Sequence, residues 1–397
     1  MNIRTVSQQN TCRGCGVCAS ICPVNAIEMR LDRHGLYYAD LAENLCIQCD
    51  KCATVCSVLQ TKPSSNQAKA IFYAYNKNPR HRLASSSGGA IGALVQAILA
   101  QGYQVMGAAY NYKTQRVCHT FINSLDEYYD FLAGSKYLPS YTVDAFRQLA
   151  TKSKVCVIGT PCQISALRKA YPNKDILFID FRCYGVCGYT LWDKYIASIQ
   201  QHFKNQKNIR SINFHSKLHS WLKWGIHIRF EDGTEYFKPK TADPFGKIFS
   251  GLGNAGENCL RCTLAAERSS ADIRVEDAWQ LSQYFESEDY KSGVSQVTVM
   301  TDRGLQIWSE ASQYLITKDV GLAHAAHGCS KPPYNQYLNK LIETPDLSIN
   351  EVIKLYNRTI PIPRRLFNWG CDLLFNVPQV YFFIKKLYRK LTKMDDV

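Results

Sequence analysis

The chain has 397 residues and a formal net charge of +14, and 46% of its residues are hydrophobic. This length allows two or three domains with cores of their own, and the composition argues against both a disordered chain and a membrane bundle. The opening residues have neither an apolar core nor a small-residue cleavage site, so we expect no secretory signal and a cytoplasmic location in which the 17 cysteines bind metal rather than form disulfides.

Eight of the cysteines form two runs of identical spacing near the start of the chain. Each run reads Cys-x2-Cys-x2-Cys-x3-Cys, and Pro23 follows the first run whereas Ser57 follows the second. This is the spacing of bacterial two-cluster ferredoxins, in which the fourth cysteine of one run binds the other cluster. We therefore predict two 4Fe–4S clusters, one on Cys12, Cys15, Cys18 and Cys56 and the other on Cys46, Cys49, Cys52 and Cys22.

Zinc sites and a disulfide framework are the alternatives for these cysteines, but zinc motifs usually pair two CxxC units rather than quartets. Between the two runs, residues 26–41 alternate apolar and polar side chains around Gly35, which predicts a short hairpin. We expect a small α+β ferredoxin-type domain over residues 1–60 and a polar linker over residues 61–70.

A Ser- and Gly-rich loop, 85–89, follows a predicted strand at 71–75 and precedes a predicted helix that stops at Gly102. Such a loop presents backbone N–H groups and the positive end of a helix dipole to an anion such as phosphate. Serine and glycine also simply cap helices, so the loop alone is a weak signal. Two strands predicted to pair, 103–111 and 117–123, then lead to a polar turn with a cation at 134–137.

The middle of the chain predicts a βαβ unit. Residues 154–159 form an apolar strand pattern, residues 163–170 a helix, and residues 176–180 a second apolar strand. Strands joined in this way are parallel, and ligands bind at their carboxyl ends. We therefore expect Cys162 and Cys183, which follow the two strands, to lie side by side.

Antiparallel strands are predicted at 212–216 and 224–230, with a hairpin return after them. A glycine-rich stretch then leads to Cys259-x2-Cys262. A single CxxC pair is ambiguous among a redox pair, half of a metal site and coincidence.

The ordered set of these motifs resembles the coenzyme F420 hydrogenase/dehydrogenase beta-subunit family, and the N-terminal domain makes the chain similar to its F420H2 dehydrogenase members. The motifs are Ser87-Gly88-Gly89, Gly134-Ser135-Lys136-Tyr137, Gly159-Thr160-Pro161-Cys162-Gln163-Ile164, Cys183-Tyr184-Gly185-Val186, Cys259-x2-Cys262, and Ala271-Asp272-Ile273 with Asp277-Ala278-Trp279. There are two departures: Glu276 stands where the family usually has glycine, and Cys187 is an extra cysteine beside Cys183.

The resemblance implies an α/β fold, with a larger FAD-binding and iron–sulfur domain over residues 71–345. The family motifs do not cover the chain beyond it, where the sequence predicts a basic helical tail over residues 346–397. We place the FAD phosphates on the loop of Ser86, Ser87, Gly88 and Gly89, with Ser135 and Lys136 near flavin or phosphate charge. Catalytic residues are not identified, since His81 and Asp277 are candidates no better than structural polar residues.

A third 4Fe–4S cluster is expected beside the flavin. Cys162 and Cys183 should meet at one sheet edge, and the loop with Cys259 and Cys262 can close over that edge. The rival for Cys183 is Cys187, and the alternative to a cluster is a redox CxxC pair with two buried thiols. Cys156 lies within a predicted strand, where a buried thiol is the ordinary interpretation, and Cys118, Cys329 and Cys371 stand alone.

These expectations combine into an iron–sulfur flavoprotein oxidoreductase. A hydride carrier exchanges two electrons, a cubane accepts one, and a flavin can link the two. The chain would exchange hydride between FAD and a reduced carrier (F420H2-like or nicotinamide) or an organic substrate, and single electrons with a ferredoxin-like partner. The alternatives are an electron-transfer subunit of a larger complex and an accessory protein of a bacterial surface-polysaccharide pathway.

Residues 353–397 carry nine basic and three acidic side chains. The cluster of Lys385, Lys386, Arg389 and Lys390 suits docking on an anionic membrane or a partner, and the alternative is a helix packed on the body. Asp372 and Pro378 interrupt the apolar stretch, so it should not span a bilayer. A nucleic acid partner is not expected, because no basic run is interleaved with stacking aromatics.

Overall fold

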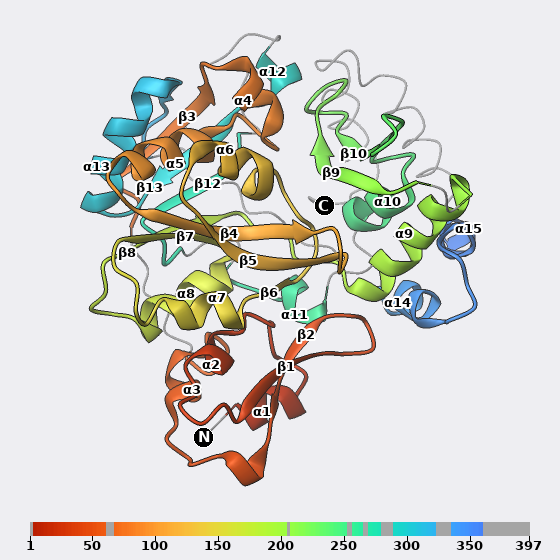
Figure 1. Cartoon of the computed structure of the whole chain (residues 1–397), viewed down its shortest axis with the longest axis horizontal. Coiled ribbons are helices and arrows are strands. Elements are labelled where there is room, and N and C mark those ends of the chain that lie inside the picture. The colour runs from red at the N-terminus through yellow and green to blue at the C-terminus, as the bar shows by residue number, and fades with distance from the viewer. Residues whose placement is uncertain are drawn as a thin grey trace.

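The computed structural model describes residues 3–60, 67–204, 207–251, 256–264, 269–278, 289–322 and 335–359. A small N-terminal region lies against a larger α/β region (Figure 1). The predicted mixed α/β class with a ferredoxin-type N-terminal region is confirmed. The predictions for Cys329, Cys371 and the basic cluster of the tail fall outside the described residues.

The N-terminal region is a hairpin with short helices around it. The predicted hairpin is confirmed: β1 (Ile27–Leu31) pairs antiparallel with β2 (Tyr37–Leu41). Gly35 lies in the turn with φ +77°, a conformation that glycine adopts without strain. Buried Val6, Ile27 and Met29 form an apolar core in this region, which Val143 of the large region joins. The helices here are α1 (Arg4–Gln8), α2 (Val17–Ser20), the 3-10 turn η1 (Glu43–Leu45) and α3 (Lys51–Val55).

Nine described strands form one large mixed sheet, in the order β14-β3-β13-β12-β8-β7-β4-β5-β6. Both predicted pairings are confirmed, since β4 pairs antiparallel with β5 and β7 pairs parallel with β8. Strands β4, β7, β8 and β12 run parallel, so their carboxyl ends share one edge. The strands are β3 (Ala70–Asn76), β4 (Gln104–Asn111), β5 (Arg116–Ile122), β6 (Ser140–Tyr141), β7 (Val155–Gly159), β8 (Ile176–Phe181), β12 (Ile273–Asp277), β13 (Ser295–Val299) and β14 (Leu315–Asp319).

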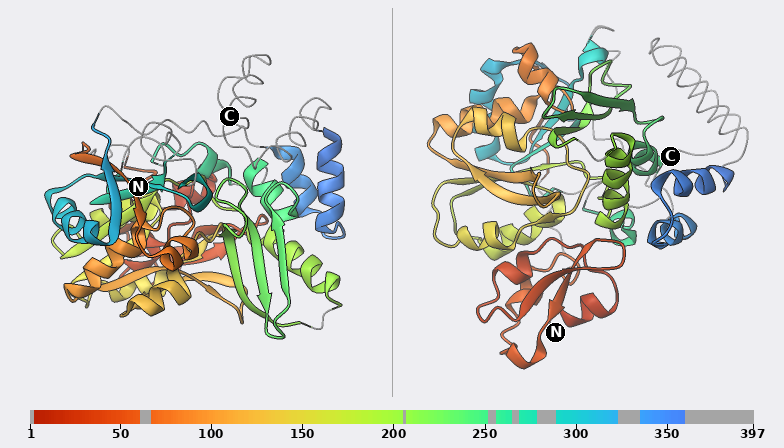
Figure 2. Two further views of the ribbon diagram at one scale, coloured as in Figure 1. Left: turned by 90° about the horizontal axis from the view of Figure 1, so that it is seen from above. Right: turned by 45° about the vertical axis from the view of Figure 1, so that its right-hand side comes forward.

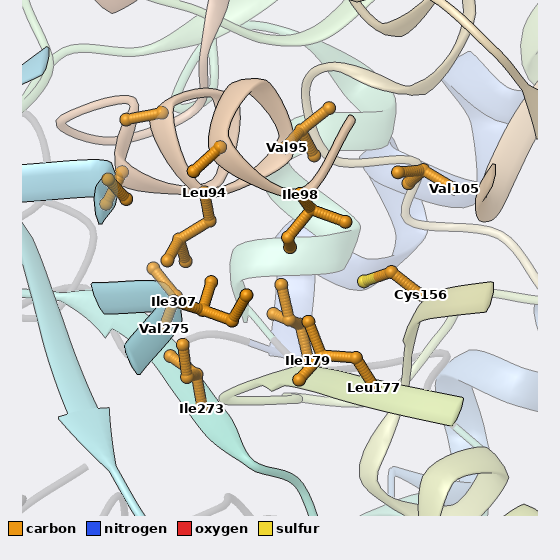
Figure 3. Close-up of a cluster of buried hydrophobic side chains, with 14 of the residues drawn as sticks. Leu94, Val95, Ile98, Val105, Cys156, Leu177, Ile179, Ile273, Val275 and Ile307 are labelled. Atoms are coloured by element: carbon orange, nitrogen blue, oxygen red, sulfur yellow. The ribbon is translucent and has the colours of Figure 1, made fainter. Parts of the chain in front are cut away.

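Helices cover both faces of this sheet. On one face, apolar residues of α5 (Ala90–Ala100) point onto the sheet, and Figure 3 shows Leu94 and Ile98 above Ile179 and Ile273. Burial of each such side chain stabilises the fold by roughly 1.5–3 kcal/mol. The other helical elements of the large region are α4 (Pro79–Ala84), α6 (Leu125–Glu127), the π-helical turn η2 (Tyr128–Leu132), α7 (Val143–Gln148), α8 (Pro161–Ala170), α11 (Glu257–Leu260), α12 (Asp289–Ser292), α13 (Asp302–Ala311) and η3 (Ser312–Tyr314).

A second, three-stranded antiparallel sheet stands beside the large one (Figure 2). It consists of β9 (Ile209–Ser216), β10 (Gly225–Phe230) and β11 (Glu235–Pro239), and packs with α9 (Tyr189–His202), α10 (Pro244–Gly251), α14 (Gln336–Glu343) and α15 (Ile349–Thr359). The α15 residues Ile349 and Val352, which fall in the predicted tail, are buried in this core. The domain limits themselves stay predictions. Within the described ranges, none of the helices is long and apolar enough to cross a membrane.

The N-terminal region packs on α7 and α8 of the large region (Figure 1). Val17 and Val55 join the core that contains Phe146 and Ala166. The Thr142 hydroxyl also donates to the carbonyl of Cys15 at 3.0 Å. The first cysteine run is therefore held directly against the large sheet's helical layer.

Candidate metal and cofactor sites

The first group of four cysteines lines one cavity. Cys12, Cys15, Cys18 and Cys56 all line this cavity. Burial is the main cause that raises the pKa of Cys15 and of Cys18, and neighbouring cysteines raise it further. Thiols crowded in this way become thiolates when metal binds, because a coordinated thiol is deprotonated outright.

The second group lines a separate cavity. Cys22, Cys46, Cys49 and Cys52 all line it. Cys22 from the first run therefore joins three cysteines of the second run, and Cys56 joins the first, as the spacing predicts. Cys49 is exposed, so this cavity reaches the protein surface.

Each quartet of thiols lines one cavity. In the described part of the chain, no three His, Cys, Asp or Glu side chains are grouped as ligands of a single metal ion. Two quartets around two cavities suit a group larger than one ion, and 4Fe–4S clusters fit them. The identity of the individual ligands stays a prediction.

A further cysteine group lies at the carboxyl edge of the large sheet. Cys162 stands in the first turn of α8, where Thr160 and Gln163 form a capping box. Burial raises the pKa of Cys162 to about 12, and Cys262 and Cys183 contribute to the rise. The structure thus brings together three of the four predicted ligands of a third cluster.

The rival cysteine remains close to the same group. Cys187 is 1% exposed, and its pKa is raised by burial and then by Cys259. Cys259 and Cys262 lie on and just after the short helix α11. The choice between Cys183 and Cys187 as the fourth ligand therefore stays a prediction.

Two buried ion pairs join β8 to β12 beside these cysteines. Arg274 lies opposite Asp180 in the strand register and contacts its carboxylate at 2.8 Å, and the two side chains are 4% and 0% exposed. Arg182 and Glu276 form the next pair along the same strands. The Arg274 guanidinium also donates to the carbonyl of Leu264, two residues beyond Cys262. The first pair therefore fixes the end of the CxxC loop to the sheet.

The predicted phosphate loop lies at the same edge. Gly89 is the N-cap of α5 and has no side chain with which to cap the first-turn amides, which an α-helix leaves without intrahelical acceptors. Gly88 has a packing role, because a Cβ there would lie 2.5 Å from the carbonyl oxygen of Ala74. Its amide donates to the Ser295 hydroxyl at 3.0 Å. The Gly88 amide is therefore already paired, and the amides without intrahelical acceptors are those at the start of α5. Anion binding there stays a prediction.

The two small polar turns contact each other. The Ser86 hydroxyl lies 3.0 Å from the Ser135 hydroxyl and accepts from the Ser135 amide at 2.8 Å. Lys136 instead donates to the carbonyls of Leu132 and Ala133, and burial lowers its pKa to about 7. Contact between Lys136 and a cofactor stays a prediction.

Asp277 lies at the carboxyl edge of the large sheet, as the last residue of β12. The other candidate, His81, stacks on Tyr129 with ring centroids 4.2 Å apart. Burial raises the pKa of Asp277 to about 6, although Ser87 and Lys217 act in the opposite direction. The Lys217 ammonium donates to the carbonyl oxygens of Ser87 and Ser292. Burial, followed by the charge of Arg82, lowers the pKa of Lys217 to about 7.

The sequence motifs do not include the residues that β9 brings to this edge. His215 and Lys217 lie at the end of an antiparallel strand of the second sheet. The contact of Lys217 with Ser87 and that of His215 with Tyr137 depend on how two sheets pack, which no local pattern indicates. The Gly134–Tyr137 motif gave an indirect signal, because the Tyr137 hydroxyl is the group bonded to His215.

Comparison with known families gives two matches. Residues 11–59 match the family model described as "4Fe-4S dicluster domain". Residues 152–321 match the family model for the C terminus of the beta subunit of coenzyme F420 hydrogenase/dehydrogenase. The chain therefore joins a dicluster ferredoxin domain to the C-terminal domain of the F420 hydrogenase/dehydrogenase beta-subunit family. The resemblance that the motifs predicted is confirmed.

Other comparisons are more distant. A chain of the F420-reducing [NiFe] hydrogenase complex from Methanosarcina barkeri is 18% identical, with a TM-score of 0.45, and the match covers 75% of this chain and 94% of that one. None of the curated proteins compared with the chain is similar enough to count as a relative. The family match supports an iron–sulfur oxidoreductase or electron-transfer subunit related to F420 hydrogenase beta subunits.

The segment at 152–321, which matches the second of these models, contains the third cysteine group, His215, Lys217 and Asp277. The loops at 86–89 and 134–137 lie between the two matched segments. Asp272 of the Ala-Asp-Ile motif is structural, since its carboxylate accepts from the Phe178 amide at 2.8 Å and the Thr301 hydroxyl at 2.9 Å. Glu276, which replaces the glycine of the family, accepts from Gln296 and pairs with Arg182.

Proposed function

We propose that the chain is an iron–sulfur flavoprotein that exchanges hydride between bound FAD and a reduced carrier (F420H2-like or nicotinamide) or an organic substrate, and single electrons with a ferredoxin-like partner. The observation that carries the proposal is that Cys162 lies close enough to Cys15 for its charge to raise the pKa of Cys15. This proximity supports an inner cavity of the dicluster domain that neighbours the cysteine group at the carboxyl edge of the large sheet. Electrons can therefore pass between the two regions of one chain.

The cysteine groups define an ordered route. The cavity of Cys22, Cys46, Cys49 and Cys52 is the outer site, because Cys49 is exposed. The cavity of Cys12, Cys15, Cys18 and Cys56 is the inner site, and Cys162, Cys183, Cys259 and Cys262 would hold a third cluster beyond it. A partner would exchange electrons at the outer site.

Residues at the sheet edge fit a flavin in charge and polarity. The start of α5 offers amides and a positive dipole end for the phosphates. Ser86 and Ser135 add hydroxyls, and Lys217 adds a cation beside the same loop. When bound, FAD supplies the conversion between two-electron hydride transfer and one-electron transfer to clusters. A hydride carries two electrons and one proton, so each pair of electrons passed to the clusters leaves one proton to release.

The test is anaerobic purification of the full chain followed by reduction with single donors. F420H2, NADH, NADPH and reduced ferredoxin would each be added, and the visible flavin absorbance and the electron-spin signals of reduced clusters would be recorded. We expect FAD to copurify, and one hydride donor to bleach the flavin before the cluster signals appear. A chain that holds clusters but no flavin would contradict the proposal. Electron transfer would then be the only function that the clusters support.

A further inference from the structure

His215 lies near the end of β9. One of its ring nitrogens forms a hydrogen bond, and the other has no partner among the described residues. The residue is 6% exposed and stacks on Trp224, with ring centroids 4.4 Å apart. Its Nδ1 forms a hydrogen bond with the Tyr137 hydroxyl. Its Nε2 is buried and has no hydrogen-bond partner among the residues that the structure describes. Buried polar groups are nearly always paired, so this nitrogen requires an explanation.

We assign the Tyr137 hydroxyl as the donor in its contact with His215, and this assignment decides which ring nitrogen carries the proton. Burial raises the pKa of Tyr137, so its hydroxyl keeps a proton that it can donate to Nδ1. Burial lowers the pKa of His215 well below its ordinary value, and Lys240 and Lys217 lower it further. A neutral imidazole has a single N–H, and with Nδ1 accepting we assign that N–H to Nε2. Within the described part of the chain, Nε2 is therefore a buried donor without an acceptor.

A chain of hydrogen bonds connects this donor to the proposed flavin site. Ser86 contacts Ser135, the Ser135 side chain contacts Tyr137, and Tyr137 contacts His215. The contacts join the loop at 86–89, the motif at 134–137 and β9. The hydrogen bonds that start in the two motifs that the resemblance links to FAD thus end at the Nδ1 of His215, on the same ring as the Nε2 donor.

The charges around His215 suit an electron-rich acceptor. Lys217 and Lys240 both lie near enough to lower the pKa of His215. Lys217 in turn lies near Arg82, which lowers its pKa, and near Asp277, which acts in the opposite direction. The described groups that act on this histidine and on Lys217 are therefore mostly cations, and buried charge of one sign favours a ligand of the other.

We propose that His215 donates a hydrogen bond from Nε2 to the pyrimidine edge of the bound flavin, the N1 and C2 carbonyl region that carries the negative charge of the reduced ring. The inference rests on the proposed function, because it takes FAD as the bound group. His215 then contacts the cofactor, and Tyr137 is a positioning residue that holds the tautomer. The donor and the two lysines favour reduced over oxidised flavin, because charge near N1 tunes flavin electronics.

Two substitutions separate the two nitrogens of the ring. His215→Asn keeps an acceptor near the position of Nδ1 for Tyr137 but removes the Nε2 donor, whereas His215→Gln keeps an amide near the position of Nε2. The matched control is His227→Asn, because His227 is also 6% exposed, lies on the adjacent strand β10 and pairs with Glu235. Tyr137→Phe is a further variant that retains the imidazole but frees Nδ1.

The readout is the flavin midpoint potential by spectroelectrochemical titration, with the affinity for oxidised FAD from fluorescence. For His215→Asn we expect reduced flavin to bind about tenfold more weakly relative to oxidised flavin, which lowers a two-electron potential by about 30 mV. His215→Gln should lose less, Tyr137→Phe should shift in the same direction, and His227→Asn should match the wild type. Iron content and thermal unfolding would verify that each variant is folded.

The outcomes distinguish this inference from the proposed function. If the wild-type chain binds no FAD, both are overturned. If it binds FAD and His215→Asn leaves the potential unchanged, only the role of His215 is overturned. An unchanged potential with a raised KM for the hydride carrier would assign the Nε2 donor to the substrate and would overturn the flavin contact.

Discussion

Cys15 and Cys162 lie close enough for the charge of Cys162 to raise the pKa of Cys15. Cys15 lines the inner cavity of the dicluster domain, and Cys162 begins α8 beside the large sheet. Residues more than a hundred positions apart are therefore neighbours at the boundary of the two regions. This proximity gives the cysteine groups an order that can be tested by removing one group at a time.

The first prediction concerns the two N-terminal clusters. Cys15→Ser and Cys49→Ser should each lower the iron content by about four per chain, because each cubane contains four irons, and the double variant should lose about eight. Bound flavin should be retained in all three variants. Iron and labile sulfide would be measured after anaerobic purification. The control is Cys118→Ser, on β5, which should keep the wild-type iron content. A colourless wild-type chain loaded with zinc would contradict the prediction.

The second prediction concerns the third cluster. Cys162→Ser and Cys259→Ser should each remove about four irons, and the two ferredoxin-type signals should persist in the electron-spin spectrum of the reduced protein. Cys156→Ser is the control, because Cys156 is a buried thiol of the apolar core.

The same measurement decides between the two rival cysteines. We expect Cys183→Ser to lose iron and Cys187→Ser to keep it. The reverse result would move the ligand to Cys187, which lies near Cys259. If Cys162→Ser keeps the wild-type iron content, no third cluster is bound there.

The parts of the fold and the site that could be predicted are those whose signal lies in the spacing of residues close together in the sequence. The cysteine spacing predicted that Cys22 joins the cysteines of the second run and that Cys56 joins those of the first. In two-cluster ferredoxins, the fourth cysteine of each run binds the other cluster. The βαβ pattern predicted that Cys162 and Cys183 meet, because parallel strands end at one edge. The place of His215 could not be predicted, because it depends on the packing of two separate sheets.

The charged residues of β8 and β12 illustrate the same limit. Strand patterning predicts an apolar run, and Ile179, Ile273 and Val275 do form the core on one face. Asp180 and Arg274 lie on neighbouring strands of that buried sheet only because each neutralises the other. Pairing of this kind joins residues that are distant in sequence, so a single sequence does not reveal it.

The third prediction tests this ion pair. Arg274→Met should lower the free energy of unfolding by about 3–5 kcal/mol, because it leaves the Asp180 carboxylate buried and unpaired. The double variant Asp180→Leu/Arg274→Met should recover most of that loss, since apolar replacement of a buried pair is often neutral. Denaturant unfolding would measure both variants.

In these two variants, iron content distinguishes a loss of folding stability from a loss of the position of the CxxC loop. Arg274 also holds the carbonyl of Leu264, near Cys262. The double variant should therefore remain short of iron even where its stability is restored. A double variant with full iron would show that the pair does not position the CxxC loop.

The last prediction is a pH dependence of stability that comes from Asp277. Burial raises the pKa of this carboxyl from 3.8 to about 6. The folded state therefore holds the proton more tightly than the unfolded state, and stability is lost as the pH rises from about 4 to about 6. Between pH 5 and pH 7, the wild-type chain should lose about 1 kcal/mol more than Asp277→Asn, which keeps an uncharged side chain of similar shape.

The measurement is thermal unfolding of both proteins across this range at a fixed scan rate. Asp302→Asn is the matched control, because the Asp302 side chain is 84% exposed and its replacement should leave the shape of the wild-type profile unchanged. Parallel pH profiles of the wild type and Asp277→Asn would show that Asp277 is not held in a buried site. A profile in which the wild type gains stability relative to Asp277→Asn as the pH rises would instead mean that Lys217 pairs with the carboxylate strongly enough to outweigh burial.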